Sequence, residues 1–389
     1  MSNVLYIGNM DKKLRKGLRT WIEIDKKAIK HNYSVFRSLI PKNTKLLAVV
    51  KSNAYGHSLI DFSKEIVKNG VDFLGVDSIV EGLALRREGI KTPILVLGYT
   101  LPELFNDAVE KNISITVSSF DTILKIKKLK TPSNKRLKIH IKVDTGMCRH
   151  GFLLKDVDKV IREIKKNKNI EIEGLFTHFS ISKDPAFPNH TRKQIKEFNV
   201  WVDAFKKAGF SPICHASATS GAIVFPEAAF DMVRIGIGLY GVWPSKETEK
   251  AYEDKINLKP VLSWKTIIGE IKKIPKGSRV GYDGTEILEK DSTIAICPIG
   301  YWHGFLRELS CKAKILVKGK RVKVLGRVCM DIIIIDVSDV NGVKVGDEVV
   351  IIGKSRKEQI SVDDISSIIS GSSYEFLTRI NPLIKKFYL

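Results

Sequence analysis

The sequence predicts an α/β fold in which a (β/α)8 barrel, or TIM-like barrel, is followed by a mainly β C-terminal domain. Two observations support this prediction. Short apolar runs alternate with amphipathic segments up to Trp243, and beyond it the pattern changes to short β-rich runs bounded by Gly and Asp. We therefore predict a basic N-terminal extension over 1–19, a barrel over 20–255 and a β domain over 256–389.

The barrel prediction rests on eight apolar runs that read as strands. Between them, apolar residues recur at three- and four-residue intervals, as expected of amphipathic helices, for example over 60–68, 79–88, 156–166 and 192–208. Repeated strand and helix units favour a parallel barrel, in which functional residues gather at the carboxyl ends of the strands. The eight runs are 46–50, 73–76, 94–97, 115–117, 137–143, 172–176, 213–215 and 232–235.

The predicted β domain contains six further runs. Lys318-Gly319-Lys320 is typical of a hairpin tip, and Val345-Gly346-Asp347 is typical of a turn before a strand. The runs are 261–268, 293–296, 314–317, 322–325, 332–337 and 348–352.

Composition excludes several classes of protein. The 389 residues are 43% hydrophobic and 28% charged, which is typical of a globular protein in solution. No segment has the unbroken apolar length of a membrane span, and the N-terminus lacks the apolar core of a secretory signal. Five scattered cysteines without metal-ligand spacing predict reduced thiols in a cytoplasmic protein and no metal site.

A net charge of +22 raises the question of nucleic-acid binding. The lysines, however, lie singly or in pairs along predicted helices, without interleaved aromatic residues or a known binding module. Solvated helix faces explain the charge, so we predict neither a nucleic-acid partner nor a membrane partner.

The most informative stretch is Val49 to Gly56, in which Lys51 ends a buried run and Tyr55 follows one helical turn later. A lysine desolvated by such a strand loses its proton more easily and becomes a nucleophile suited to an aldehyde cofactor. The alternative is a strand-end lysine whose amine reaches water.

Other polar residues also fall at or just beyond the predicted strand ends. Each alone has an ordinary explanation, such as a core histidine or a surface ion pair. Their shared position at one rim of a barrel favours an active site. They are Lys142, Asp144 and Arg149 after the fifth run, His178 after the sixth, His215 in the seventh and Arg234 in the eighth.

Six segments in this order resemble the signatures of the alanine racemase family, and residues 20–25 (TWIEID) resemble the usual start of that family. The segments are VVKSNAYGH (49–57), KVDTGMCR (142–149), LFTHF (175–179), MVRIGIGLYG (232–241), RVGYDG (279–284) and GRVCMD (326–331).

The resemblance implies an isomerase that uses pyridoxal 5′-phosphate and belongs to fold type III of the enzymes with this cofactor. It also implies a head-to-tail homodimer with shared active sites. It implies interconversion of L-alanine and D-alanine, which supplies D-alanine for peptidoglycan in the cell wall. Lys51 would hold the cofactor and act as one catalytic base, and Tyr282 of the partner subunit would be the other. Two bases suit racemisation because a proton leaves one face of the α-carbon and another returns to the opposite face.

The resemblance also implies roles around the cofactor ring. Arg234 would face the pyridine nitrogen and keep it unprotonated, which restrains side reactions. His178 would bond the catalytic tyrosine and, with Arg234 and His215, lower the cost of forming its phenolate. The cofactor phosphate would be bound by Tyr55, Thr219, Ser220 and the backbone N–H groups of Gly236 and Ile237.

For the substrate, the resemblance implies that Arg149 binds the carboxylate and that Met330 of the partner subunit offers its backbone N–H. Lys142 resembles a lysine that is carbamylated in many relatives and orients this arginine. Cys329 lies in the same partner loop as Met330, and Asp331 supports that loop. The alternative for Cys329 and Met330 is packing within the β domain.

Three positions depart from the family pattern. Trp302 and His303 replace an Ala-Asp pair near the expected entrance corridor, which puts substrate entry and size selection in question. Ala218 replaces an asparagine, while Thr219 keeps the hydroxyl of the usual serine. Asn381-Pro382 lies where many relatives place a tyrosine beside the phosphate.

Other functions remain open from sequence alone. One is a related racemase of broader or serine specificity, another is a fold-type III amino-acid decarboxylase, and a third is a non-catalytic cofactor-binding protein made of the barrel alone. The pair of Lys51 and Tyr282 favours racemisation, and a β domain carrying Tyr282 and Met330 argues against the binding protein.

Overall fold

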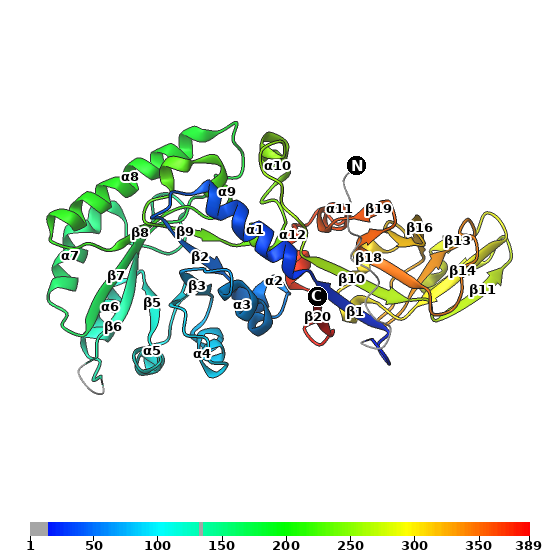
Figure 1. The fold of residues 1–389 in the computed structure, drawn as a ribbon, viewed down its shortest axis with the longest axis horizontal. Helices are drawn as coiled ribbons and strands as arrows, with labels where there is room; N and C mark the ends of the chain where they lie inside the picture. Colours follow the sequence, from blue (N-terminus) through cyan, green and yellow to red (C-terminus); the bar gives the residue numbers. More distant parts are fainter. Residues whose placement is uncertain (1–14, 132–134) are drawn as a thin grey trace. The chain divides into compact units, whose positions relative to one another are not determined.

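The computed structural model describes residues 15–131 and 135–389, and it divides into two compact units (Figure 1). One unit is the barrel, residues 26–261, and the other combines the residues up to Asp25 with 262–389. Both ends of the barrel differ from the predicted 20–255. Strand β1 (Thr20–Ile24) pairs with β10 (Leu262–Ile267) and β20 (Lys386–Tyr388), which places β1 in the unit of the β domain. Most of the predicted N-terminal extension, residues 1–14, lies outside the described residues.

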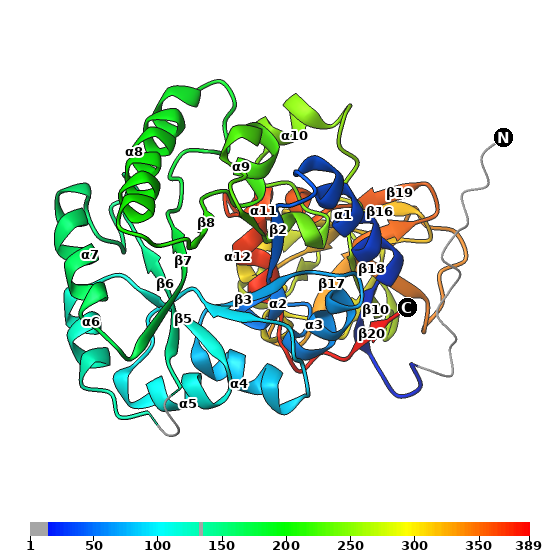
Figure 2. The same ribbon diagram turned by 60° about the vertical axis from the view of Figure 1, so that its left-hand side comes forward.

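All eight predicted barrel strands are confirmed. They form one parallel sheet in the order β8-β7-β6-β5-β4-β3-β2-β9, and the backbone N–H of Asp231 donates to the carbonyl of Cys214 (3.0 Å) between its two ends (Figure 2). Most of their residues are buried, which is why they read as continuous apolar runs. The strands are β2 (Lys45–Val49), β3 (Phe73–Val76), β4 (Ile94–Val96), β5 (Ile113–Val117), β6 (Leu137–Lys142), β7 (Ile170–Phe176), β8 (Ile213–His215) and β9 (Met232–Ile235).

Helices follow the barrel strands and bury one apolar face each, as Val160 and Ile164 of α7 show. The four predicted helices correspond to α3 (Leu59–Val67), α4 (Ile79–Arg87), α7 (Val157–Lys165) and α8 (Pro188–Lys207). The structure adds α1 (Lys26–Leu39), α2 (Lys51–Tyr55), α5 (Phe105–Glu110), α6 (Phe120–Lys127), α9 (Thr219–Val224) and α10 (Lys246–Tyr252).

The six predicted strands of the β domain are also confirmed. They are β10, β14 (Ser292–Cys297), β15 (Lys314–Val317), β16 (Lys320–Leu325), β17 (Ile333–Asp336) and β18 (Glu348–Ser355). The tip of the β15–β16 hairpin is Lys318-Gly319, where φ is 48° and 80°. Such values suit the turns that match strand twist. The structure adds β11 (Glu270–Ile274), β12 (Arg279–Val280), β13 (Glu286–Ile287), β19 (Glu358–Ile360), α11 (Val362–Ile368) and α12 (Ser373–Thr378).

Within residues 15–131 and 135–389, none of the helices combines the length and apolar character needed to cross a membrane.

Candidate active site

Lys51 begins a left-handed helical turn. The four residues after it, Ser52 to Tyr55, have φ between 50° and 56°, so the predicted spacing of Lys51 and Tyr55 is right but the hand of the turn is unusual. This conformation costs L-residues about 1–2 kcal/mol each, so the segment needs support from outside. Glu81 supplies part of it, because its Oε1 accepts the N–H groups of Ser52 (2.8 Å) and Asn53 (3.4 Å).

Glu81 also ties this turn to the loop after β3. Its Oε2 accepts the N–H of Asp77 at 2.8 Å, and its backbone N–H donates to Ser78 Oγ in the capping box of α4. One carboxylate therefore positions the segments on both sides of the Lys51 amine. Glu81 was not predicted, since on the sequence it is one more acidic residue at a helix start.

The Lys51 amine is less buried than predicted. Its side chain is 38% exposed, and Nζ pairs with Asp77 Oδ1 at 3.1 Å. In this structure Lys51 therefore agrees with the alternative of a strand-end lysine whose amine reaches water. A pair of this exposure contributes about 0–1 kcal/mol and opens easily.

Arg234 is the buried charge of the site. Nη1 donates to His215 Nδ1 at 2.7 Å, and Nη2 donates to the carbonyls of Thr177 (2.8 Å) and Ala216 (2.7 Å) and lies 3.3 Å from His178 Nδ1. Burial lowers the pKa of Arg234 to about 9, which leaves the guanidinium charged at neutral pH. Arg234 thus contacts both histidines that the resemblance grouped with it, whereas the predicted bond from His178 to Tyr282 stays a prediction.

Positive groups converge around His178 and Lys142. Burial, followed by the charges of Arg234 and Arg149, lowers the pKa of His178 to about 3. Burial also lowers the pKa of Lys142, to about 8, and the charges of the same two arginines are the next largest causes. The charge of Lys51 contributes to both shifts. Such a cluster suits an anionic ligand, because bound negative charge would relieve the repulsion among the four basic groups.

Asp144 shapes the loop that presents Arg149. Its Oδ1 accepts the N–H groups of Gly146, Met147 and Cys148, and Oδ2 accepts the N–H of Arg149 at 2.8 Å. Burial alone raises the pKa of the Asp144 carboxyl, but these four hydrogen bonds outweigh it and hold the pKa below its ordinary value. The Arg149 side chain is exposed, as a group that receives a substrate from solvent must be.

We expect Asp144→Asn to loosen this loop and raise the KM for the substrate more than it lowers kcat. An amide cannot accept at both atoms, so at least one N–H loses its partner, at a cost of about 1–3 kcal/mol in stability. Because the folded-state pKa of Asp144 is depressed, its stabilisation is present above the unfolded pKa of about 3.9 and is lost as pH falls through the folded value.

Steady-state kinetics and unfolding curves at several pH values test this prediction. Asp121→Asn, which alters an exposed ion pair with Lys125, is the matched control, and it should change stability by no more than about 0.5 kcal/mol. An Asp144→Asn protein with wild-type KM and the wild-type loss of stability in acid would contradict the assignment.

Tyr55, Thr219 and Gly236 form a cradle at the ends of β2 and β9. Thr219 Oγ1 accepts the N–H of Gly236 at 3.1 Å, and a Cβ placed on Gly236 would lie 2.7 Å from the Tyr55 hydroxyl. Tyr55 is buried against Tyr240, with ring centroids 4.9 Å apart. Hydroxyls and backbone N–H groups that face a residue without a side chain are the groups expected around a phosphate.

Ser220 lies beside Thr219, and its Oγ is 2.7 Å from Ser182 Oγ. Ala218, in the place of the usual asparagine, is the residue before α9 and caps this helix with no side-chain hydrogen bond. The Thr219 hydroxyl lies beside the Gly236 N–H, and phosphate binding by it stays a prediction.

Tyr282, Trp302 and Met330 belong to the β domain, where each side chain is more than half exposed. Two backbone hydrogen bonds join the loops of Trp302 and Met330, Tyr301 N–H to Cys329 O and Trp302 N–H to Met330 O, both 3.0 Å. Lys51 and Tyr282 thus lie in different units, and their pairing stays a prediction.

The departures at Trp302, His303 and Asn381 prove to be neighbours. Asn381 Nδ2 donates to the Trp302 carbonyl at 3.0 Å, and the Asn381 N–H donates to the His303 carbonyl at 3.2 Å. Asp331 lies 3.9 Å from His303 Nδ1. Asn381 therefore holds the turn that carries the bulky pair, a role that its place in the family pattern did not suggest.

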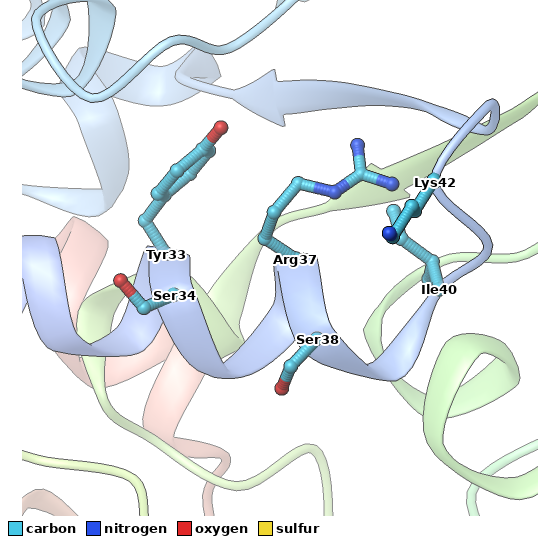
Figure 3. Close-up of a pocket in the computed structure, with 6 residues that line it drawn as sticks. All are labelled: Tyr33, Ser34, Arg37, Ser38, Ile40 and Lys42. Atoms are coloured by element: carbon cyan, nitrogen blue, oxygen red, sulfur yellow. The ribbon is translucent and has the colours of Figure 1, made fainter.

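A shallow pocket on α1 contains none of the predicted site residues (Figure 3). The Arg37 guanidinium, which lines this pocket, already donates hydrogen bonds to the carbonyls of Thr44 and Pro41. We assign it no function. It is lined by Tyr33, Ser34, Arg37, Ser38, Ile40 and Lys42.

Comparison with known proteins shows which family the chain resembles along its length. The family described as alanine racemase, N-terminal domain, matches residues 24–244, and the corresponding C-terminal domain matches 261–388. An alanine racemase of Methanococcus maripaludis is 39% identical over 371 residues, which cover 95% of this chain and 98% of the relative.

Two solved structures extend the comparison. Alanine racemase from Bacillus anthracis, with bound L-Ala-P, has a TM-score of 0.90 and 32% identity over 95% of both chains. Alanine racemase from Bartonella henselae, with covalently bound pyridoxal phosphate, has a TM-score of 0.86 and 26% identity over 95% of this chain and 99% of the other.

Proposed function

This chain belongs to the alanine racemase family, and from that premise we propose how its residues interconvert L-alanine and D-alanine with pyridoxal 5′-phosphate. The activity is alanine racemisation, an isomerase reaction. The observation that best supports the residue roles is the convergence of Lys51, Lys142, Arg149 and Arg234 on His178 in the barrel. As its metabolic role we propose supply of D-alanine for peptidoglycan.

The barrel residues fit the cofactor. Tyr55, Thr219, Ser220 and the N–H groups of Gly236 and Ile237 would hold its phosphate, and Lys51 would hold it covalently. When bound, pyridoxal phosphate draws electrons from the α-carbon of the amino acid and makes the α-proton removable. Arg234, charged and fixed by three hydrogen bonds, would face the ring nitrogen and keep it unprotonated.

Two bases would move the protons. The Lys51 amine would take or return the proton on one face, and the hydroxyl of Tyr282 of the partner subunit would do so on the other. His178, whose lowered pKa keeps it neutral at pH 7, would accept a hydrogen bond or donate one to that hydroxyl without adding charge. Arg149 would hold the substrate carboxylate between them.

Lys142 is suited to carbamylation. Its pKa of about 8 leaves a fraction of the amine neutral at physiological pH, and only a neutral amine attacks CO2. The ammonium first loses one proton. The neutral amine then forms a nitrogen–carbon bond to CO2 and releases a second proton, so that the positive group becomes a negative carbamate. The new charge would offset the surrounding cations and orient Arg149.

The exposed face of the β domain would complete the site in a head-to-tail homodimer. Tyr282, Trp302 and Met330 are large apolar or aromatic side chains left exposed, and such groups are enriched at interfaces. Met330 would offer its backbone N–H to the carboxylate, with Cys329 and Asp331 in the same loop. We expect the protein to be a homodimer in solution. Loss of activity when the dimer dissociates would support this arrangement.

Incubation in D2O tests the reaction. The purified protein with pyridoxal phosphate is given L-alanine or L-serine separately, and chirality and α-deuterium are followed together. We expect alanine to racemise much faster than serine. Comparable turnover of serine would implicate Trp302 and His303 in a broader specificity, whereas release of CO2 without exchange would indicate a decarboxylase and contradict racemisation.

A further inference from the structure

A buried chain of four polar side chains crosses the barrel interior behind Arg234. Arg234 Nη1 lies 2.7 Å from His215 Nδ1, His215 Nε2 lies 2.9 Å from His140 Nδ1, and His140 Nε2 lies 3.0 Å from Glu173 Oε2. Both imidazoles have no exposed surface. The chain links β9, β8, β6 and β7, and its far half, His140 and Glu173, was not predicted from the sequence.

The hydrogen bonds of this chain can have only one direction from donor to acceptor. A guanidinium only donates, so His215 Nδ1 must accept and the His215 hydrogen is on Nε2. That hydrogen is donated to His140 Nδ1, which places the His140 hydrogen on Nε2, facing the Glu173 carboxylate. Both rings are then neutral, and the chain joins a cation at one end to an anion at the other.

Glu173 is held as an acceptor. The Ser114 hydroxyl donates to the same Oε2, and Lys138 Nζ lies 3.5 Å from Oε1. Burial alone raises the pKa of Glu173, but the hydrogen bonds from His140 and Ser114, together with the charge of Lys138, hold the pKa below its ordinary value. The carboxylate is therefore ionised at neutral pH and receives the His140 N–H.

The backbone of β7 is shaped around this contact. The pairing of β6 with β7 shifts register, so that Ile139 pairs with Ile172 but His140 pairs with Gly174, which leaves Glu173 as the extra residue of a bulge. Bulges re-aim side chains beside active sites. A Cβ on Gly174 would lie 2.0 Å from His140 Nδ1, so only glycine leaves room for the imidazole.

We propose that His140, Glu173 and Gly174 form a positioning unit that fixes the His215 tautomer and thereby holds Arg234 toward the cofactor's ring nitrogen. This inference rests on the proposed function of Arg234. Without the Glu173 acceptor, His140 loses the partner of its Nε2–H. The opposite tautomers would then set a His215 N–H against the guanidinium N–H, so the Arg234 contact loosens.

Nitrogen NMR of the cofactor-free, histidine-labelled protein tests the hydrogen positions directly. Signals are assigned with His140→Asn and His215→Asn variants. We expect both rings to be neutral at pH 7, each with its hydrogen on Nε2. A doubly protonated ring, or a hydrogen on Nδ1 of either histidine, would overturn the proposal whatever the activity of the enzyme.

Kinetics of three variants test the positioning role. Glu173→Leu removes the acceptor, and we expect kcat to fall roughly tenfold, as for loss of one buried hydrogen bond, while the KM for alanine changes little. Glu173→Gln keeps an acceptor and should recover most of kcat. Ile139→Val, a neighbour of His140 without a polar contact, controls for altered packing of the barrel.

The outcomes separate this inference from the proposed function. The positioning role would be overturned if Glu173→Leu and Ile139→Val had equal kcat. It would also be overturned if Glu173→Gln and Glu173→Leu lowered kcat equally. If Glu173→Leu fails to fold, the NMR result on the wild-type protein decides. A wild-type protein without racemase activity would instead refute the proposed function and leave the tautomer measurement intact.

Discussion

Lys51→Ala should abolish covalent attachment of pyridoxal phosphate and lower racemisation in both directions, by at least roughly 10²–10⁴-fold. The same amine would hold the cofactor and serve as one of the two bases, so one substitution removes both contributions. Borohydride reduction followed by mass spectrometry measures attachment, and chiral analysis of alanine measures turnover. This is the largest effect that we expect from any single change in the barrel.

Lys51→Arg is the matched control for the ion pair with Asp77. It keeps a positive charge beside the Asp77 carboxylate, which lies 3.1 Å from Nζ of Lys51 in the wild-type protein, but a guanidinium is too weak a nucleophile to hold the cofactor. We expect it to fold like the wild-type protein and to be as inactive as Lys51→Ala. Attachment of the cofactor to either variant at the wild-type level would contradict the assignment of Lys51.

The barrel was predictable because its strands are buried on both faces. Runs such as Leu46 to Val50 and Ile94 to Leu97 are apolar throughout, and the helices between the strands repeat at the helical period. The position of β1 was not predictable, since its pairing with β10 joins residues 20–24 to residues about 240 positions later. A short alternating strand carries no signal of which sheet it will join.

The rim residues were predictable for a related reason, because parallel strands end at one edge and a strand-end position places a side chain there. Their supports were not. Glu81 holds the turn after Lys51, and Glu173 reaches His140 through a bulge, and both contacts depend on tertiary geometry. Four successive residues with positive φ were also unexpected, since Ser52, Asn53, Ala54 and Tyr55 include no glycine.

Tyr282→Phe should leave cofactor attachment intact and impair racemisation, most strongly in the direction in which the tyrosine removes the α-proton. The ring keeps its shape and only the hydroxyl is lost, so a drop of roughly 10²–10⁴-fold is the range for losing one acid–base group. The variant should stay as stable as the wild-type protein, because the Tyr282 side chain is 66% exposed in the β domain.

Isotope exchange in D2O separates the two bases. With Tyr282→Phe, Lys51 still removes the α-proton of one enantiomer, so that enantiomer should gain deuterium with its chirality retained, while the other exchanges slowly. Tyr301→Phe, at a second exposed tyrosine of the β domain, is the matched control and should racemise alanine in both directions. Equal turnover of Tyr282→Phe and wild type in both directions would exclude a two-base mechanism, because a lysine on one face of the α-carbon would then be sufficient for both proton transfers.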